Sequence, residues 1–183
     1  MAAKAQVRFK ASDIWDAPDN GKIYEVIDGQ LFVSPAPLFR HQLGLMRLAL
    51  RVGPWIEEHH LGVIVSAPTG VVLDDENGVQ PDLLYISTER AGIISNRGVE
   101  GAPDLVVEAL SPSTQDRDRG IKMRRYAASG VPHYWLLDLE APALETYRLG
   151  ADGYILTGKY GRGDIFRPEI FPGLEINMDE IWA

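Results

Sequence analysis

The chain has 183 residues, of which 45% are hydrophobic and 24% are charged, a composition typical of a globular domain with one substantial core. It contains no cysteine, which excludes disulfides and thiolate metal sites, so a bound metal would need oxygen or imidazole ligands. A net charge of -8 argues against a protein that coats nucleic acid nonspecifically, because such binding depends on lysine and arginine.

No apolar run approaches the roughly eighteen residues that a membrane-spanning helix needs. Residues 1–12 also lack the continuous apolar core of a secretory signal. The chain shows no internal repeat and no low-complexity tract. We therefore expect a single domain over residues 1–183, with residues 1–20 as a lead-in segment, in a cytoplasmic protein that makes no membrane contact.

The first half of the chain predicts a hairpin followed by a helix. Residues 24–27 and 30–33 are β-prone runs joined by Asp28-Gly29, a strong hairpin signal. After the proline-rich segment 34–37, residues 41–60 predict a helix, which we expect to be disturbed near Pro54. Its apolar positions at helical spacing are Leu45, Leu48, Val52 and Ile56.

The rest of the chain predicts strands with one further helix. Strands are expected over residues 62–66, 69–73 and 82–86, with a polar turn at 74–78, and a central strand over the apolar run 105–110. Ser113 and Asp116 resemble a capping box that opens a helix over 114–129. A strand at 134–138, with Tyr134 and Trp135 in the core, and an antiparallel pair at 145–148 and 154–157 follow. The order predicts an α/β fold: a mixed sheet flanked by helices, with an N-terminal β-hairpin and additional C-terminal antiparallel strands.

Four charged residues lie in or beside apolar runs, where an ionised group is costly unless it is paired or binds a metal: Glu25, Asp82, Glu108 and Lys122. If the strands of Asp82 and Glu108 are neighbours, their carboxylates meet and repel, and a divalent cation would remove that conflict. The absence of cysteine favours magnesium or manganese. A salt bridge between Glu108 and Lys122 without metal is the alternative.

Lys122 shares a helix face with Tyr126 at the i+4 spacing. Phosphodiester cleavage needs an activated water, a Lewis acid on the phosphate and a positive group for the developing charge. Asp82, Glu108 and Lys122 could supply all three. The surrounding basic helix is usually a solvated face, yet Arg119 and Arg125 could also bind phosphates.

The sequence resembles the Uma-type restriction endonuclease family of the PD-(D/E)xK nuclease superfamily over roughly residues 24–173. The segments that carry the resemblance are Gln80-Pro81-Asp82-Leu83, residues 104–114 with Glu108 and Ser111-Pro112-Ser113, then Lys122, Tyr126 and residues 130–135.

The resemblance implies a restriction-endonuclease-like fold and a metal-dependent endonuclease. It implies that Asp82, Glu108 and the backbone carbonyl of Ala109 bind Mg²⁺ or Mn²⁺, that Glu25 is an auxiliary acid, and that His41 lies near the site. The lysine usual two residues after the glutamate is Leu110 here, so Lys122 must supply that charge. DNA is the expected substrate, with RNA left open, and the family's frequent assembly suggests a homodimer.

Two other functions stay open from the residues alone. One is a catalytically inactive nuclease-fold module for nucleic-acid or protein binding, which the acidic charge and the displaced lysine favour. The other is a glycosidase that uses Glu108 with a second carboxylate. Lys122 and the lack of a sugar-stacking aromatic stripe argue against the glycosidase.

Overall fold

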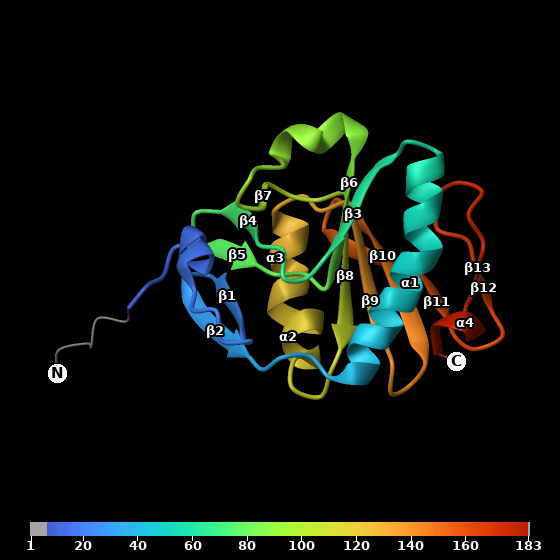
Figure 1. The fold of residues 1–183 in the computed structure, drawn as a ribbon, viewed down its shortest axis with the longest axis horizontal. Helices are drawn as coiled ribbons and strands as arrows, with labels where there is room; N and C mark the ends of the chain where they lie inside the picture. Colours follow the sequence, from blue (N-terminus) through green and yellow to red (C-terminus); the bar gives the residue numbers. More distant parts are fainter. Residues whose placement is uncertain (1–6, 183) are drawn as a thin grey trace.

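The computed structural model describes residues 7–182 and shows two main sheets (Figure 1). The larger, six-stranded sheet has the order β11-β10-β9-β8-β6-β3. Its strands are β3 (Gly62–Ser66), β6 (Leu83–Ser87), β8 (Leu105–Leu110), β9 (His133–Asp138), β10 (Ala143–Gly150) and β11 (Gly153–Tyr160). Strands β8 and β9 are parallel and the other neighbours are antiparallel, so the sheet is mixed.

The five-stranded sheet has the order β2-β1-β5-β4-β7. Its strands are β1 (Ile23–Ile27), β2 (Gln30–Ser34), β4 (Val71–Asp74), β5 (Asn77–Val79) and β7 (Val99–Glu100). A small sheet pairs β12 (Ile165–Phe166) with β13 (Ile176–Asn177). The helices are α1 (Phe39–Glu58), α2 (Gln115–Arg117), α3 (Met123–Ala128) and α4 (Asp179–Trp182), with a π-helical segment η3 (Asp118–Lys122) and 3-10 turns η1 (Ala11–Asp16) and η2 (Thr88–Ile93).

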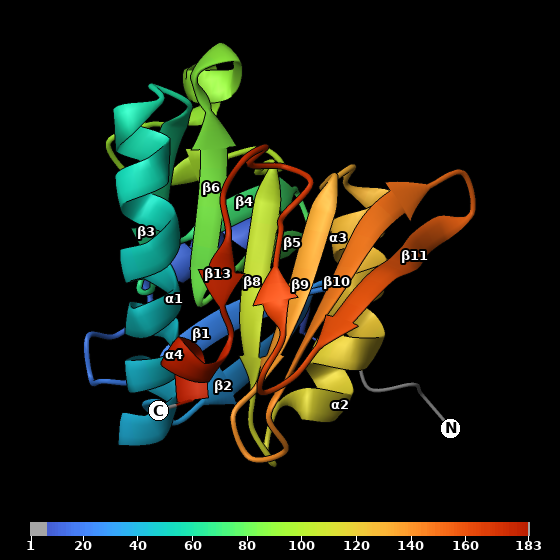
Figure 2. The ribbon, with the colours of Figure 1, turned by 90° about the vertical axis from the view of Figure 1, so that its right-hand side faces the viewer.

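The six-stranded sheet is covered on both faces by different elements. Helix α1 and the C-terminal segment with β12, β13 and α4 lie on one face, whereas α2, α3 and the five-stranded sheet lie on the other (Figures 1 and 2). Two hydrophobic cores result, one around Trp135 and Phe171 and the other around Tyr126 and Tyr134. Because both faces of β8 are covered, all of its residues are buried.

Most predicted elements are confirmed, and so is the fold class. The hairpin forms β1 and β2, residues 62–66 and 105–110 are strands with the expected bounds, and β6, β9, β10 and β11 lie where strands were predicted. The four apolar residues named for the first helix are all buried. Tyr134 and Trp135 are core residues, as expected.

Three local predictions are wrong. The turn predicted at 74–78 ends early, because Asn77 begins β5 and bonds back to Asp74 through its side chain. Helix α1 continues through Pro54, which lies on the exposed face where water can bond the carbonyl that a proline leaves unpaired. No capping box opens the second helix: Thr114 is its N-cap and makes no side-chain cap bond.

The second helix runs over residues 115–128 without a break, and its middle turn, η3, is a wider π-helical turn. π-Helical turns are rare in proteins, and those that occur are often found at functional sites. Here the turn places Asp118 and Lys122 among the buried residues of the helix. Among residues 7–182, no helix is both long and apolar enough to cross a membrane.

Candidate functional site

The carboxylates of Asp82 and Glu108 lie on the same face of the six-stranded sheet. Leu83 on β6 pairs with Val107 on β8 in antiparallel register, so Asp82 and Glu108 are the next pair along the two chains. Alternate residues of a strand face opposite sides. Leu84 and Val106, which share this parity, belong to the core beneath α3. Both carboxylates therefore face α2 and α3.

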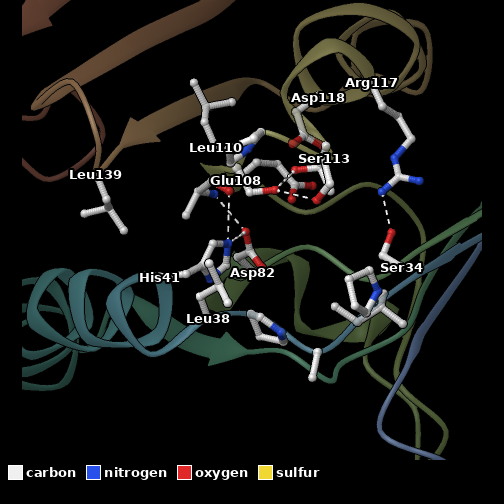
Figure 3. A pocket seen from close by; sticks show the side chains of 18 of the residues that line it. Ser34, Leu38, His41, Asp82, Glu108, Leu110, Ser113, Arg117, Asp118 and Leu139 are labelled. Carbon is white, nitrogen blue, oxygen red and sulfur yellow. Dashed lines mark hydrogen bonds and ion pairs between the residues drawn. The ribbon is translucent and has the colours of Figure 1, made fainter.

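Asp82 is held by the strand that carries Glu108. Its Oδ2 accepts a 2.8 Å hydrogen bond from the backbone N–H of Ala109. Nε2 of His41, from the first turns of α1, lies 3.2 Å from the same oxygen and 3.0 Å from the carbonyl oxygen of Ala109 (Figure 3). The Asp82 carboxylate and the Ala109 carbonyl thus converge on one point.

His41 sits at that point of convergence. Burial lowers the pKa of His41, but the hydrogen bond and the charge of Asp82 outweigh it, so its pKa is raised above the ordinary 6.5. Its Nδ1 is buried without a hydrogen-bond partner. His41 therefore lies next to Asp82, near the acids, where it was expected.

Lys122 lies among three buried carboxylates. Its Nζ is 2.6 Å from Oε1 of Glu108, 2.9 Å from Oε1 of Glu25 and 3.7 Å from Oδ1 of Asp118. Oε1 of Glu108 also accepts a 2.7 Å hydrogen bond from the Tyr126 hydroxyl. Glu25 accepts a further bond from the backbone N–H of Gln80.

The charges of this cluster shift one another's pKa. Burial alone would lower the pKa of Lys122, but Glu108, Glu25 and Asp118 raise it well above its usual value, so the lysine stays charged. Burial raises the pKa of Glu108 well above its usual range, and Lys122 only partly opposes this. Burial also raises the pKa of Asp118. Lys122 brings one positive charge to three acids and Arg117, 3.7 Å from Glu25, brings a second, so the remaining acid is best accommodated by a proton or a bound cation.

The donor atoms fit a hard divalent cation. Within residues 7–182, no three His, Asp or Glu side chains form a complete cage for a metal ion. Mg²⁺ needs less, because it keeps several waters and takes one or two carboxylates. The Asp82 carboxylate and the Ala109 carbonyl already converge, and both contacts of Glu108 use Oε1, which leaves Oε2 outside them. Oxygen donors beside surplus negative charge are the ligands that Mg²⁺ and Mn²⁺ prefer.

The site opens into a cavity of about 420 Å³. Glu25, His41, Asp82, Glu108 and Lys122 line it together, with walls formed by the segment before α1 and the segment between β8 and α2. Figure 3 shows Arg117 and Ser34 on one side of the carboxylates and Leu139 on the other. The cavity gives a ligand access to the carboxylates.

Arg119 and Arg125 are not brought to this cavity. Arg119 pairs with Glu145 on β10 at 2.5 Å, and Arg125 pairs with Asp28 in the turn between β1 and β2, also at 2.5 Å. Neither lines the cavity. The expected phosphate-binding pair therefore lies on other faces of the helix.

The sequence did not single out three residues that the structure adds to the site. Asp118 lies four residues before Lys122, a helical spacing that could have revealed it. Arg117 lines the cavity, donates a 2.7 Å hydrogen bond to Ser34 Oγ, and has a buried Nε with no partner. No sequence signal marks Arg117 or Ser34, because their meeting depends on how α2 packs against the five-stranded sheet.

Comparisons with known proteins agree with this fold. The chain matches the family described as "Uma2: Putative restriction endonuclease" over residues 11–179. It is similar to a solved structure titled as a "putative nuclease belonging to DUF820" from Anabaena variabilis ATCC 29413, with a TM-score of 0.75 and 14% identity over 95% of this chain and 97% of that one. No curated protein matches. Since the family match spans nearly all of the chain, the chain belongs to the Uma2 family of restriction-endonuclease-like proteins.

Proposed function

We propose that this chain is a Mg²⁺- or Mn²⁺-dependent endonuclease that hydrolyses phosphodiester bonds in DNA. The observation that carries the proposal is that the Asp82 carboxylate and the Ala109 carbonyl, which share Nε2 of His41 as a partner, line the same cavity as Glu108 and Lys122. Membership of a family described as restriction endonucleases supports the same activity.

In this proposal, Asp82, Glu108 and the Ala109 carbonyl hold the cation. When bound there, a divalent ion would polarise a phosphate oxygen and lower the pKa of a nearby water. Hydrolysis adds the oxygen of one water to phosphorus and breaks one P–O ester bond. One water proton goes to the leaving oxygen, the other stays on the new phosphate monoester or is released to solvent, and the products are that monoester and a free hydroxyl.

The remaining residues position charge. Lys122 carries the positive charge that stabilises the negative charge developing on the phosphate, the role of a preorganised donor. Glu25 binds Lys122 together with Glu108, and Tyr126 holds Oε1 of Glu108. His41 contacts the oxygens of Asp82 and Ala109 and holds them in place until the cation takes the position of its Nε2 between them.

The test compares wild type with Asp82→Asn. Asparagine keeps an oxygen that can accept the Ala109 hydrogen bond, so the fold is preserved while the ligand charge is lost. With Mn²⁺ and fluorescently labelled DNA, we expect Asp82→Asn to lose cleavage by at least about 100-fold. The matched control is Asp152→Asn, a change of an exposed acid in the turn between β10 and β11, which should cleave like wild type.

Calorimetry with MnCl₂ separates the enzyme from an inactive module. Wild type should bind Mn²⁺, and Asp82→Asn should bind it at least about tenfold more weakly. Cleavage by Asp82→Asn at the wild-type rate would refute the mechanism. Absence of both Mn²⁺ binding and cleavage in the wild type would favour the inactive module.

A further inference from the structure

The reactive groups lie at the bottom of a cavity and not on an open surface. Asp82, Glu108 and Lys122 are 8%, 3% and 3% exposed. A cavity of about 420 Å³ has the size of a pocket for a small molecule. A phosphodiester bond must descend into it to react, which is difficult for a stiff, continuous duplex.

The walls of the cavity are mostly apolar. Pro35, Pro37 and Leu38 line it from the segment before α1, and Leu110, Pro112 and Leu139 line it from the ends of β8 and β9 and the residues that follow them. Apolar side chains offer little to the phosphates of a duplex, whose binding depends on lysine and arginine. They suit the faces of bases that have left a base pair.

An exposed aromatic residue begins α1, directly after the segment that lines the cavity. Phe39 is 79% exposed and Leu38 is 70% exposed, although both are large and apolar. Phe39 sits between Leu38 and Arg40, which both line the cavity. Aromatic side chains at such positions stack on unpaired bases without regard to sequence.

Arg117 is one of the cations that line the cavity, and it is suited to a neighbouring phosphate. Arg117 lies over the Phe32 ring, donates to Ser34 and keeps its Nε free of any partner. Its Nη2 is 3.7 Å from Oε2 of Glu25, so the guanidinium is close to the acids but not fully engaged by them. An arginine held in this way can bind one phosphate oxygen pair of a strand.

We propose that the site takes an unpaired DNA strand, either a single strand or a flap beside a duplex, with a base on Phe39 and a phosphate on Arg117. This inference rests on the proposed nuclease function and specifies its substrate. A continuous duplex would meet the apolar rim before its phosphates reached the carboxylates.

The experiment uses the full chain with Mn²⁺ and three labelled DNAs that contain the same sequence. The first is a single strand, the second is a duplex with a flap, and the third is a duplex whose two ends are closed by short hairpin loops. We expect kcat/KM for the single strand and the flap to exceed that for the closed duplex by at least about tenfold, with cuts mapped to the unpaired part. Equal or better cleavage of the paired region of the closed duplex overturns the proposal.

A binding measurement keeps this inference separate from the nuclease proposal. If wild type cleaves none of the DNAs, the nuclease proposal fails. Fluorescence anisotropy with Asp82→Asn then still compares the single strand with the closed duplex, and tighter binding of the duplex overturns the substrate proposal alone.

Phe39→Ala tests the stacking surface. We expect it to raise KM for the single strand several-fold with kcat unchanged, since stacking contributes to binding and not to the chemical step. The matched control is Ile155→Ala, which removes a 59% exposed apolar side chain from β11 and should leave KM unchanged. An equal KM in the two variants contradicts the role of Phe39.

Discussion

Lys122 serves the fold as well as the site. It is 3% exposed and contacts Glu25, Glu108 and Asp118, all of which are also buried. Removing one partner of a buried ion pair leaves charge without compensation, and such losses are large. A buried lysine among acids is therefore both a structural residue and the cation of the proposed reaction.

Lys122→Ala should therefore destabilise the protein. We expect the free energy of unfolding in urea to fall by about 3–5 kcal/mol. Lys159→Ala is the control, because Lys159 pairs with Glu145 at 61% side-chain exposure and should cost less than about 1 kcal/mol. Wild-type stability in Lys122→Ala would mean that the three acids need no lysine to be buried.

The site residues that the sequence suggested share one property. Glu25, Asp82, Glu108 and Lys122 each interrupt or border an apolar run, where a charge needs a reason. Arg117 sits in a run of polar residues and gives no such contrast. A charged residue within an apolar run can be recognised from the sequence. A charged residue in a polar run, such as Arg117, cannot be assigned to the cavity until the fold is known.

Among the elements, strands with strong local patterns were predictable. β8 was found with its bounds because six consecutive buried residues need cover on both faces. β5, β7, β12 and β13 have two or three residues each and exist only through their partners. Gly78 in β5, for example, approaches Ala11 so closely that an added Cβ would lie 2.4 Å from its carbonyl oxygen.

The ion pairs of Glu145 connect three elements. Glu145 on β10 accepts hydrogen bonds from Arg119 on η3 at 2.5 Å, Lys159 on β11 at 3.0 Å and Tyr147 at 2.8 Å. The hydrogen bond from Arg119 is the largest cause that lowers the pKa of Glu145, from 4.5 to about 2, although burial opposes it. The helix that carries Lys122 is thereby fixed to β10, next to the edge strand β11.

Glu145→Gln should show this link as a pH-dependent loss of stability. A carboxyl whose pKa is lower in the folded state stabilises the fold above its unfolded pKa and loses that effect as the pH falls through the folded pKa. We expect Glu145→Gln to be less stable by about 1–2 kcal/mol above pH 5, since both cations are partly exposed. The gap should close between pH 4.5 and about 2.

Urea unfolding of both proteins from pH 7 down to pH 3 measures that gap. Glu175→Gln is the control, because Glu175 pairs with Arg167 at the surface and the change should cost less than about 1 kcal/mol. A gap between wild type and Glu145→Gln that stays constant down to pH 3 would contradict the ionic link.

At the scale of the whole molecule, the sequence predicted one mixed sheet, and the chain divides its strands between two sheets that enclose α2 and α3. The division cannot be found from strand patterns, because pairing partners far apart in the chain decide it. The cavity lies where the segment between β2 and α1 passes from one sheet to the other side of the molecule. The expected homodimer stays a prediction.

The net charge of -8 sets how this protein can hold DNA. Arg119 and Arg125 are occupied by Glu145 and Asp28, so they add little to a phosphate-binding surface. Besides Lys122, which three acids surround, Arg40 and Arg117 line the cavity, so a strand bound there would meet about two further cations. Binding should therefore depend less on salt than it does for a basic DNA-binding protein.

We predict that the affinity for a single DNA strand depends only weakly on salt concentration. For a single strand that contacts about two phosphates, the slope of log K against log[salt] should be about -1.4, so affinity should fall only about sevenfold between 50 and 200 mM KCl. Fluorescence anisotropy with Asp82→Asn at constant Mn²⁺ measures the slope, and Arg117→Gln should make it shallower by about 0.7. A slope steeper than about -4 would mean that many cations outside the cavity bind the strand, and that the acidic surface does not limit its access.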